Sequence, residues 1–477
     1  NSASDGGGAV FVSDKSSASW RGNTTFSNNT AHQGGALYVG NNSRVSWEAH
    51  TLFDDNSAVF TGGAVNVYNG SNVSWEAATS FCSNSGQWGG GVHVENNSRV
   101  SWEAETLFGG NHAPLDGGGA GLDVYDGSSA SWTARTRFVD NNATKHGGAI
   151  NVNDASLNWT GETSFSNNSA IYGGALSSLS SRIFWAGVTT FSNNSAAFGG
   201  AVLTSVGSRT SWEAETSFIG NYVSGFGGAL NIFKNSTISW AEKTSFFENI
   251  GDGGGGAIYA MNHTDVSWEA ETEFVDNSAN GAGGAVLIEY GSSTTWGATT
   301  LFRNNDAGTS GGAVSMSSSN ENSEDIMSSI FDRNFANVAG GAVFVASVGV
   351  GPQFTGVTFT SNSAGRGGAV SITGSGTSLT NYEYLNPTTF DQCYFFRNEA
   401  TIDGGAVESG AGQDRFIETT FVHNVAPVAG ALSLAGTAFI SNCTFVENAS
   451  AEGEGAAISN VGSIEIANGT FFADNVF

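Results

Sequence analysis

The chain has 477 residues and is strongly acidic, with 43 Asp and Glu against 16 Lys and Arg and a formal net charge of −27. This balance argues against nucleic acid as a partner, because phosphate binding needs a clustered basic surface, and it disfavours docking to anionic lipid. No apolar run approaches the roughly 18 residues that a spanning helix needs, so we expect no membrane insertion by this segment.

A short repeat begins at the first residue and continues to the end of the sequence. The pattern FxxN occurs seventeen times, from Phe26/Asn29 to Phe472/Asn475, mostly 26 to 30 residues apart. A second pattern, Gly-Gly-Ala followed by an aliphatic residue, recurs with it in nearly every repeat, and the aliphatic residue lies about eight residues after the Asn, as in residues 34–37 after Asn29. A fixed period of this length is typical of solenoid proteins.

Within one repeat the side chains alternate with a period of two, as residues 100–108 illustrate. One side of an extended chain receives Val100, Trp102, Ala104, Thr106 and Phe108, and the other receives Ser101, Glu103, Glu105 and Leu107. The aliphatic pairs after Gly-Gly-Ala alternate in the same way. The pattern therefore predicts about three short strands in each repeat.

These features predict an all-β fold, a single-stranded parallel β-helix of about 17 coils with about 28 residues each. We expect it to be right-handed, because crossover connections between parallel strands usually are. The Asn of each coil would stack on the next as a ladder, and the Phe would form an inner column. Eleven of the twelve Trp, from Trp20 to Trp296, lie six residues before the ladder Phe. Their parity favours an inward Trp stack over an exposed aromatic ribbon.

We interpret residues 1–477 as one continuous solenoid. Its first part, residues 1–312, carries the Trp row, whereas residues 313–477 lack it and have longer loops. The polar segment 315–329 separates the two parts, and the longer spacing between Phe359 and Phe395 predicts that residues 377–387 form a loop outside the coil.

The sequence offers little that resembles a catalytic or cofactor site. Arg135 and Arg137 are the only close basic pair, and Arg135 occupies the column of Glu105 and Glu162, where it relieves like-charge stacking. Lys145 and His146 lie at a glycine corner without paired carboxylates. We therefore predict no catalytic residues, no enzyme activity and no cofactor. Weak candidates for Ca²⁺ are Glu48, Glu76 and Glu103, which follow Trp in successive coils.

Many Asn residues lie in N-glycosylation sequons, and several fall in predicted turns. The candidates are Asn23, Asn28, Asn41, Asn69, Asn72, Asn96, Asn142, Asn158, Asn167, Asn193, Asn235, Asn262, Asn442, Asn448 and Asn468. If the chain is secreted by a eukaryote, glycans would line up along the coils.

The paired motifs GGA[ILV] and FxxN resemble the repeats of the chlamydial polymorphic outer-membrane proteins, which are surface-exposed autotransporter passengers. The resemblance covers the whole chain, and it implies a β-helix displayed at a cell surface that acts in adhesion.

From these observations we predict an extracellular or cell-surface structural protein, a glycosylated subunit or segment of a filament, hair or wall-associated fibre. Neither end of the sequence carries a capping segment, so we also expect end-to-end self-association or membership of a longer array. The alternatives are an adhesin that binds a host or carbohydrate receptor and, ranked lower, a polysaccharide lyase or epimerase.

Overall fold

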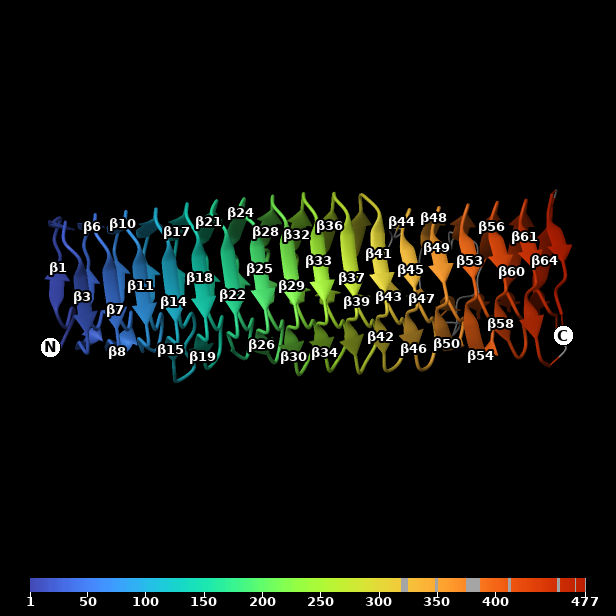
Figure 1. Ribbon diagram of the computed structural model, residues 1–477, viewed down its shortest axis with the longest axis horizontal. Coiled ribbons are helices and arrows are strands. Elements are labelled where there is room, and N and C mark those ends of the chain that lie inside the picture. Colours follow the sequence, from blue (N-terminus) through green and yellow to red (C-terminus); the bar gives the residue numbers. More distant parts are fainter. Residues whose placement is uncertain are drawn as a thin grey trace, which may run out of the picture. The chain divides into compact units, whose positions relative to one another are not determined.

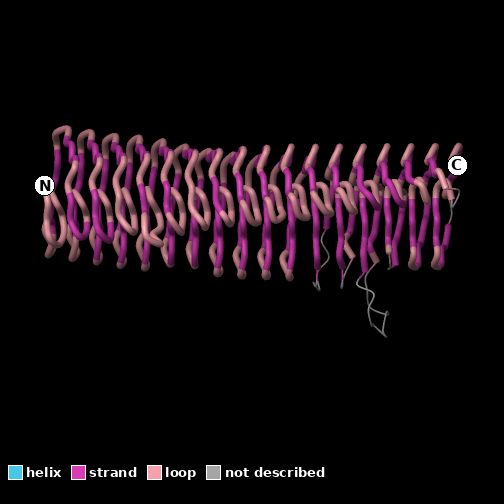
Figure 2. Tube along the Cα trace, turned by 90° about the horizontal axis from the view of Figure 1, so that it is seen from below, coloured by secondary structure: helices cyan, strands magenta, loops and turns pink. Residues whose placement is uncertain are grey.

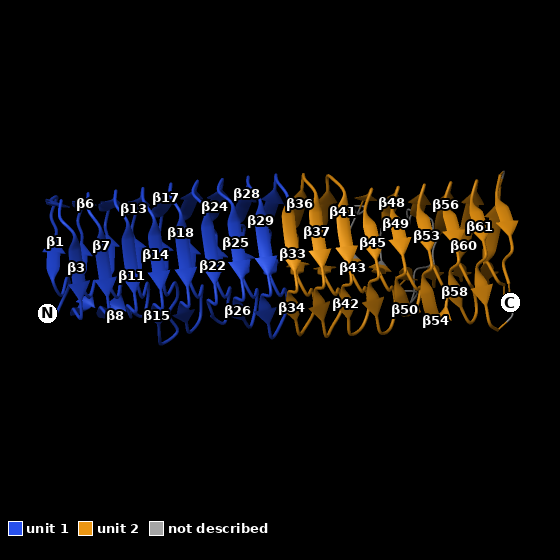
Figure 3. Ribbon diagram, in the orientation of Figure 1, with its two compact units in different colours: residues 1–243 blue, residues 244–477 orange. Residues whose placement is uncertain are grey.

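The computed structural model describes residues 1–318, 325–347, 351–374, 387–410, 413–452, 455–467 and 469–476. Residues 319–324 of the expected loop at 315–329, nearly all of the expected loop at 377–387 and the candidate Asn468 lie outside these residues. The described ends of the first of these segments belong to strands, Val314–Ser318 and Asp325–Met327, and not to a loop. The chain divides into two compact units, unit 1 from Asn1 to Lys243 and unit 2 from Thr244 to Phe477, coloured separately in Figure 3. Each unit is described by itself, and the continuity of the solenoid stays a prediction.

The expected fold class is confirmed. The chain is all-β, with parallel strands stacked as a solenoid of about 16 turns of about 28 residues. The tube in Figure 2 shows the coils of each unit following one another as strands joined by short turns. The part of the chain that the structure describes holds no helix long and apolar enough to cross a membrane. The handedness stays a prediction.

Within each unit the strands lie in parallel sheets, where a strand pairs with the equivalent strand of the next coil (Figure 1). The first sheet, which we call the GGA sheet, starts after Gly-Gly-Ala. In unit 1 its strands are β1 Val10–Val12, β5 Leu37–Val39, β9 Val65–Tyr68, β12 Val92–Glu95, β16 Leu122–Tyr125, β20 Ile150–Asn153, β23 Leu176–Leu179, β27 Val202–Ser205 and β31 Leu230–Phe233. In unit 2 they are β35 Ile258–Met261, β39 Val286–Glu289, β43 Val314–Ser318, β47 Val343–Ser347, β51 Val370–Gly374, β55 Val407–Ser409, β59 Leu432–Leu434 and β63 Ile458–Asn460.

The second sheet, the Trp sheet, has strands that end on Trp. In unit 1 these are β2 Ser17–Trp20, β6 Arg44–Trp47, β10 Asn72–Trp75, β13 Arg99–Trp102, β17 Ser129–Trp132, β21 Ser156–Trp159, β24 Arg182–Trp185, β28 Arg209–Trp212 and β32 Thr237–Trp240. Unit 2 has β36 Asp265–Trp268 and β40 Ser293–Trp296. Its later coils form a separate sheet without Trp, made of β44 Asp325–Met327, β48 Gln353–Thr355, β52 Thr388–Asp391, β56 Gln413–Ile417, β60 Thr437–Ser441 and β64 Ser463–Ile466.

The third sheet, the Phe sheet, carries the Phe of the FxxN pattern. In unit 1 its strands are β3 Thr24–Ser27, β7 Thr51–Asp54, β11 Thr79–Cys82, β14 Thr106–Gly109, β18 Thr136–Val139, β22 Thr163–Ser166, β25 Thr189–Ser192 and β29 Thr216–Ile219. In unit 2 they are β33 Thr244–Phe247, β37 Thr272–Val275, β41 Thr300–Arg303, β45 Ile330–Asp332, β49 Thr358–Thr360, β53 Tyr394–Phe396, β57 Thr420–Val422, β61 Thr444–Val446 and β65 Phe471–Ala473.

Many coils add a fourth strand directly after the ladder Asn, so the expectation of about three strands was one too few. In unit 1 these short strands are β4 Thr30–Gln33, β8 Ser57–Thr61, β15 His112–Ala113, β19 Asn142–Ala143, β26 Ser195–Ala196 and β30 Tyr222–Val223. In unit 2 they are β34 Ile250–Gly251, β38 Ser278–Ala279, β42 Asp306–Ala307, β46 Phe335–Ala336, β50 Ser363–Arg366, β54 Glu399–Asp403, β58 Val425–Ala426 and β62 Ala449–Ser450. Most span only two residues, too few for an alternation to be seen in the sequence.

The Gly-Gly-Ala corner shows why glycine recurs there. Gly62 has a φ of 62°, a left-handed conformation that side chains disfavour. A Cβ on Gly63 would collide with the carbonyl oxygen of Gly90 in the next coil. Ala64 is fully buried and begins the packed interior. At this corner, Gly62 and Gly63 therefore leave no room for a larger residue.

The core consists of aromatic columns, as the parity of the sequence predicted. Trp102 has 1% of its surface exposed and Phe108 has none. The Trp102 ring stacks on Trp75 with centroids 4.8 Å apart and on Trp132 at 4.6 Å. The chain bends between Trp102 and Thr106, yet the even spacing still brings Trp and Phe to the same interior. The alternative of an exposed Trp ribbon is therefore wrong.

The aromatic column resumes in unit 2 where the Trp row ends, which the sequence analysis missed. Phe354, Phe390 and Phe416 are fully buried and stack with centroid distances of 4.8 Å and 5.0 Å. They lie five residues before the ladder Phe rather than six, because the turn between the strands is shorter by one residue. Because the spacing to the ladder Phe is five residues instead of six, these Phe residues were not recognised as the equivalents of Trp.

Candidate functional site

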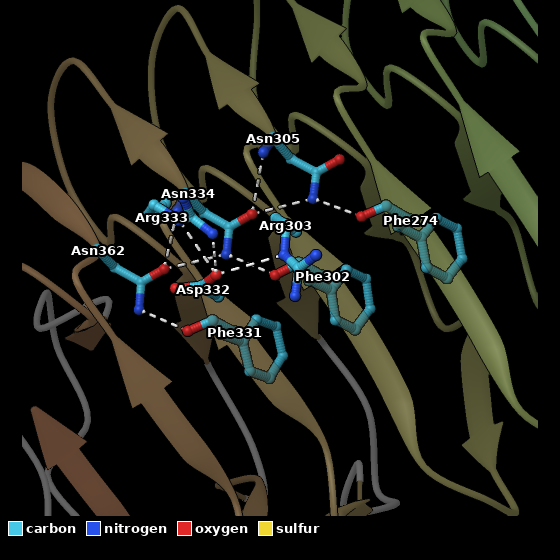
Figure 4. A network of polar contacts seen from close by, with 9 residues as sticks. All are labelled: Phe274, Phe302, Arg303, Asn305, Phe331, Asp332, Arg333, Asn334 and Asn362. Carbon is cyan, nitrogen blue, oxygen red and sulfur yellow. Dashed lines mark hydrogen bonds and ion pairs between the residues drawn. The ribbon is translucent and has the colours of Figure 1, made fainter.

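The Asn ladder is the most regular polar feature of both units, and Figure 4 shows a part of it in unit 2. The side-chain Nδ2 of Asn334 donates to Oδ1 of Asn362 at 3.0 Å and to the carbonyl oxygen of Phe302 at 3.0 Å. Its backbone N–H donates to the same Oδ1. Its own Oδ1 accepts from the backbone and side chain of Asn305. Each amide thus joins three coils.

Burial of these amides fixes their role. Asn334 is 1% exposed and Asn362 is fully buried. A buried amide whose donors and acceptors are all paired stabilises the fold and offers no group to a substrate. On the adjacent surface, Asp332 pairs with Arg303 at 3.3 Å and with Arg333 at 2.8 Å (Figure 4). The ladder is a structural device, as the sequence predicted.

A second ladder, made of serine, was missed. The backbone N–H of Ser43 donates to Oγ of Ser71 at 3.2 Å, and that of Ser71 donates to Oγ of Ser98 at 3.3 Å. The chain of bonds continues from Ser98 to Oγ of Ser128 at 3.1 Å. All four serines are at most 1% exposed. The signal was present, because each serine directly precedes a strand of the Trp sheet.

The same serine ladder gives a structural reason for several sequons. Ser43, Ser71 and Ser98 are the hydroxyl residues of the sequons at Asn41, Asn69 and Asn96.

The backbone conformation explains the Asn of many sequons. In nine of them the Asn has a positive φ, which Asn tolerates better than most residues. These nine are Asn28, Asn41, Asn69, Asn96, Asn167, Asn193, Asn235, Asn262 and Asn442. The positive φ of these turns is therefore sufficient to explain why Asn stands at these positions, whether or not a glycan is attached.

The exposure of the glycosylation candidates varies. Exposed positions are Asn23, Asn28, Asn72, Asn142, Asn158, Asn167, Asn193, Asn235 and Asn442, while Asn41, Asn69, Asn96 and Asn262 are half-buried. Asn448 is fully buried in the ladder and donates to Asn475 and to the carbonyl of Phe421. A sugar on Asn448 would displace these bonds, so the folded chain has no room for one there.

The three weak Ca²⁺ candidates do not form a cation site. Glu48, Glu76 and Glu103 are exposed, and Glu48 lies 3.4 Å from the Arg21 guanidinium. Across the described ranges, no group of three or more His, Cys, Asp or Glu side chains could hold a metal ion.

The prediction that Arg135 relieves repulsion between acidic neighbours fits the observed contacts. Arg135 lies 3.5 Å from Glu162, and Arg137 lies 3.5 Å from Glu105. All four side chains are well exposed, so each pair contributes little to stability. These arginines do not form a catalytic cluster.

The candidate binding surface is a groove of about 400 Å³ on the outer face of the GGA sheet in unit 1. Its floor is formed by the outward second residues of β20, β23 and β27, namely Asn151, Ser177 and Leu203. One wall comes from residues just before Gly-Gly, which include Trp88, His146 and Tyr172, and the other from strand ends such as Tyr125, Asn153 and Phe233. We call it the GGA groove.

Aromatic rings dominate the walls of the GGA groove. The rings of His146 and Tyr172 stack with centroids 5.1 Å apart, and Phe198, which does not line the groove, continues this stack at 5.5 Å from Tyr172. Burial and the charge of Lys145 lower the pKa of His146, so the imidazole is neutral at pH 7. Flat apolar rings beside amide and hydroxyl groups are typical of sites that bind sugars.

A buried charged cluster adjoins this groove. Nδ1 of His93 on β12 lies 2.7 Å from Oδ2 of Asp123 on β16, and its Nε2 lies 3.3 Å from Oε2 of Glu95. Asn151 donates to the other Asp123 oxygen at 2.8 Å. His93 is 4% exposed and Asp123 is fully buried. Both were missed, although the Gly-Gly-Ala motif aligns them in neighbouring coils.

The cluster holds His93 in its charged form. Burial lowers the pKa of His93, but its hydrogen bonds and charge interactions with Asp123 and Glu95 outweigh this and raise it to about 9. Because both ring nitrogens are engaged and the ring is buried, His93 is not placed to exchange protons with a substrate. Its role is to neutralise the Asp123 carboxylate beneath the outer face.

We expect the stability of the protein to depend on pH through His93. Its folded pKa of about 9 lies above the unfolded value near 6.5, so the stabilisation is complete below pH 6.5 and is lost as pH rises through 9. The stabilisation is about 3 kcal/mol. Urea unfolding of the wild type and His93→Gln at pH 6.5 and 9.5 checks this. The wild type should lose more stability than the variant, and equal losses would contradict the assignment.

Stacked parallel sheets, buried ladders and in-register repeats define a β-solenoid repeat protein. A family model, the Chlamydia polymorphic membrane protein (Chlamydia_PMP) repeat, matches the chain in three places, at residues 23–40, 188–205 and 243–261. Each match contains an FxxN motif and the Gly-Gly-Ala that follows it, so the expected resemblance is confirmed at the level of the repeat. No curated protein matches the chain.

Proposed function

We propose that the chain is a non-enzymatic structural solenoid, a glycosylated subunit or segment of a surface fibre. The repeat matches and the solenoid fold fit a surface, autotransporter-passenger-like repeat protein. The observation that carries the structural role is the buried Asn ladder, in which amides such as that of Asn334 bond the coils before and after them. Such cross-links resist separation of the coils.

The exposed sequons support the glycosylated form of this proposal. Asn23, Asn28, Asn72, Asn142, Asn167, Asn193, Asn235 and Asn442 present side chains that a sugar could extend into solvent. Acidic groups and glycans together would keep the surface hydrated, in line with the net charge of −27. Self-association belongs to the same proposal, because the outermost coils of a β-solenoid present unpaired backbone groups to a further coil.

Imaging of the native material tests the structural role. Immunogold labelling with an antibody against this chain should decorate surface fibres, and glycopeptide mass spectrometry should find sugars on several exposed sequons and none on Asn448. The buried Asn448 serves as the internal control, because its sequon is intact but its amide is engaged. Discrete, unglycosylated molecules that do not polymerise would contradict the proposal.

An adhesin is the second candidate, and the GGA groove favours it. The ring surfaces of Trp88, Tyr125 and Tyr172 around a volume of about 400 Å³ suit a carbohydrate receptor. In the imaging experiment, label confined to points of contact between cells, without fibres, would favour this candidate. Nothing among the described residues favours the lyase or epimerase alternative.

A further inference from the structure

A second groove, of about 530 Å³, lies on the outer face of the Trp sheet in unit 1. It crosses four neighbouring strands, β21, β24, β28 and β32. Trp and the residue two places earlier, which is Leu157, Ile183, Thr210 or Ile238, point inward on these strands and are buried, so the alternate residues form the outer face. We call this the Trp-sheet groove.

Two arginines lie side by side in the Trp-sheet groove. Arg182 on β24 and Arg209 on β28 are register partners, so their backbones are about 4.8 Å apart. Both side chains are exposed, and neither forms an ion pair or a side-chain hydrogen bond with any residue that the structure describes. Like charges directly opposite one another destabilise a sheet.

Arg182 and Arg209 are distinguished by being register partners, because other arginines, such as Arg44 and Arg99, also form no ion pair with a described residue. Several other basic residues lie close to a carboxylate. Arg135 and Arg366, for example, lie 3.5 Å and 3.3 Å from Glu162 and Asp403. Arg182 and Arg209 instead have Ser156 and Thr237 as their register neighbours on either side. The fold thus leaves two guanidinium groups unneutralised at one place.

The remaining lining of the groove suits a sugar ring. Phe184, between the register partners Asn158 and Ser211, leaves 41% of its surface exposed. An exposed ring face packs against the apolar face of a sugar. The hydroxyls of Ser211 and Ser239 lie along the same row and can donate to or accept from ring hydroxyls.

We propose that the Trp-sheet groove binds an anionic polysaccharide, with Arg182 and Arg209 holding its sulfate or carboxylate groups and Phe184 stacking on a sugar ring. Planar guanidinium groups bind such anions through paired hydrogen bonds. Binding of a polyanion would require this local site, because the net charge of −27 makes the protein as a whole repel polyanions. This site is independent of whether the chain forms fibres.

Binding of defined polysaccharides to the full chain tests the proposal. Protein made in bacteria, which carries no N-glycan on Asn158, is titrated with dextran sulfate, polygalacturonate and neutral dextran at 50 mM salt. We expect binding to at least one of the two anionic polymers and not to neutral dextran, and the stronger of the two identifies sulfate or carboxylate as the bound group. Absence of binding to both, or equal binding of single-stranded DNA, would overturn the proposal.

The chain provides a matched control for the arginine pair. Arg182→Ala with Arg209→Ala should weaken binding at least tenfold and reduce its dependence on salt. Arg44→Ala with Arg99→Ala removes the same charge from the same strand position, but Asn72 separates these two arginines. This control should change affinity less than twofold, and an equal loss in both double variants would overturn the site. Unchanged near-ultraviolet circular dichroism verifies that each variant folds.

Asn158 allows a test on the native protein. This sequon Asn lines the Trp-sheet groove, so an attached glycan would fill the space that the polysaccharide needs. Mass spectrometry of native material should therefore find Asn158 without sugar even where other exposed sequons carry it. A fully glycosylated Asn158 would contradict the proposed site.

Discussion

Replacement of Asn111 by Ala is expected to lower the free energy of unfolding by about 3 to 5 kcal/mol. Nδ2 of Asn111 donates to the carbonyl of Phe81 and to Asn141, both at 2.9 Å, and its Oδ1 accepts from the backbone and side chain of Asn84. The substitution leaves the Phe81 carbonyl and two Asn84 donors buried without these partners, and each such group costs about 1 to 3 kcal/mol. Urea unfolding followed by Trp fluorescence measures the loss.

An exposed Asn of the next coil supplies the control for this experiment. Asn142 directly follows the ladder residue Asn141, and its side chain is exposed. Asn142→Ala should change the unfolding free energy by less than about 0.5 kcal/mol, as surface substitutions usually do. Similar losses in the two variants would show that the ladder bonds do not stabilise the coils.

Replacement of Trp102 by Ala is expected to cost about 3 to 5 kcal/mol, because it removes a buried ring and leaves a cavity between two others. The ring is stacked between Trp75 and Trp132, and the edge of Phe108 contacts it with centroids 5.7 Å apart. A cavity at this point interrupts the column on both sides. Thermal or urea unfolding, with near-ultraviolet circular dichroism as a second probe, measures the effect.

Trp102→Phe is the matched variant, and it should cost only about 1 to 2 kcal/mol. The indole Nε1 of Trp102 is buried and has no hydrogen-bond partner, so the loss of this donor carries no penalty. Unit 2 builds the corresponding column from Phe354, Phe390 and Phe416. A loss as large as that of the Ala variant would mean that the volume of the indole, and not aromatic stacking, determines stability.

The fold was largely predictable because the repeat is short and the same few residue types, those of FxxN and Gly-Gly-Ala, recur at fixed places within it. Parity alone placed Trp102 and Phe108 inside, although a bend separates their strands. Spacing arguments failed where a turn changed length, so the Phe354 column was not recognised. The short strands after the ladder Asn were missed because two residues show no alternation.

The candidate binding surfaces were harder to predict because they are built from outward-facing residues, which differ from coil to coil. Only some coils carry an aromatic or charged residue at such a position. Arg182 and Arg209 are 27 residues apart in sequence and become neighbours only through the register of β24 and β28. His93 and Asp123 are 30 residues apart and meet in the same way. Alignment of the repeats on the Trp of each coil would have brought the arginines together, since each lies three residues before its Trp, and alignment on the glycine corner would have done so for His93 and Asp123.

The Asn ladder also has a polarity. In both units a ladder Asn accepts at its Oδ1 from the preceding coil and donates from its own amide to the Oδ1 of the following one, as in the series Asn84, Asn111, Asn141 and Asn305, Asn334, Asn362. The two faces of a coil are therefore chemically different at this point. A further coil, whether from this chain or from another copy, can continue the ladder in one sense only, since the opposite sense would bring acceptor against acceptor.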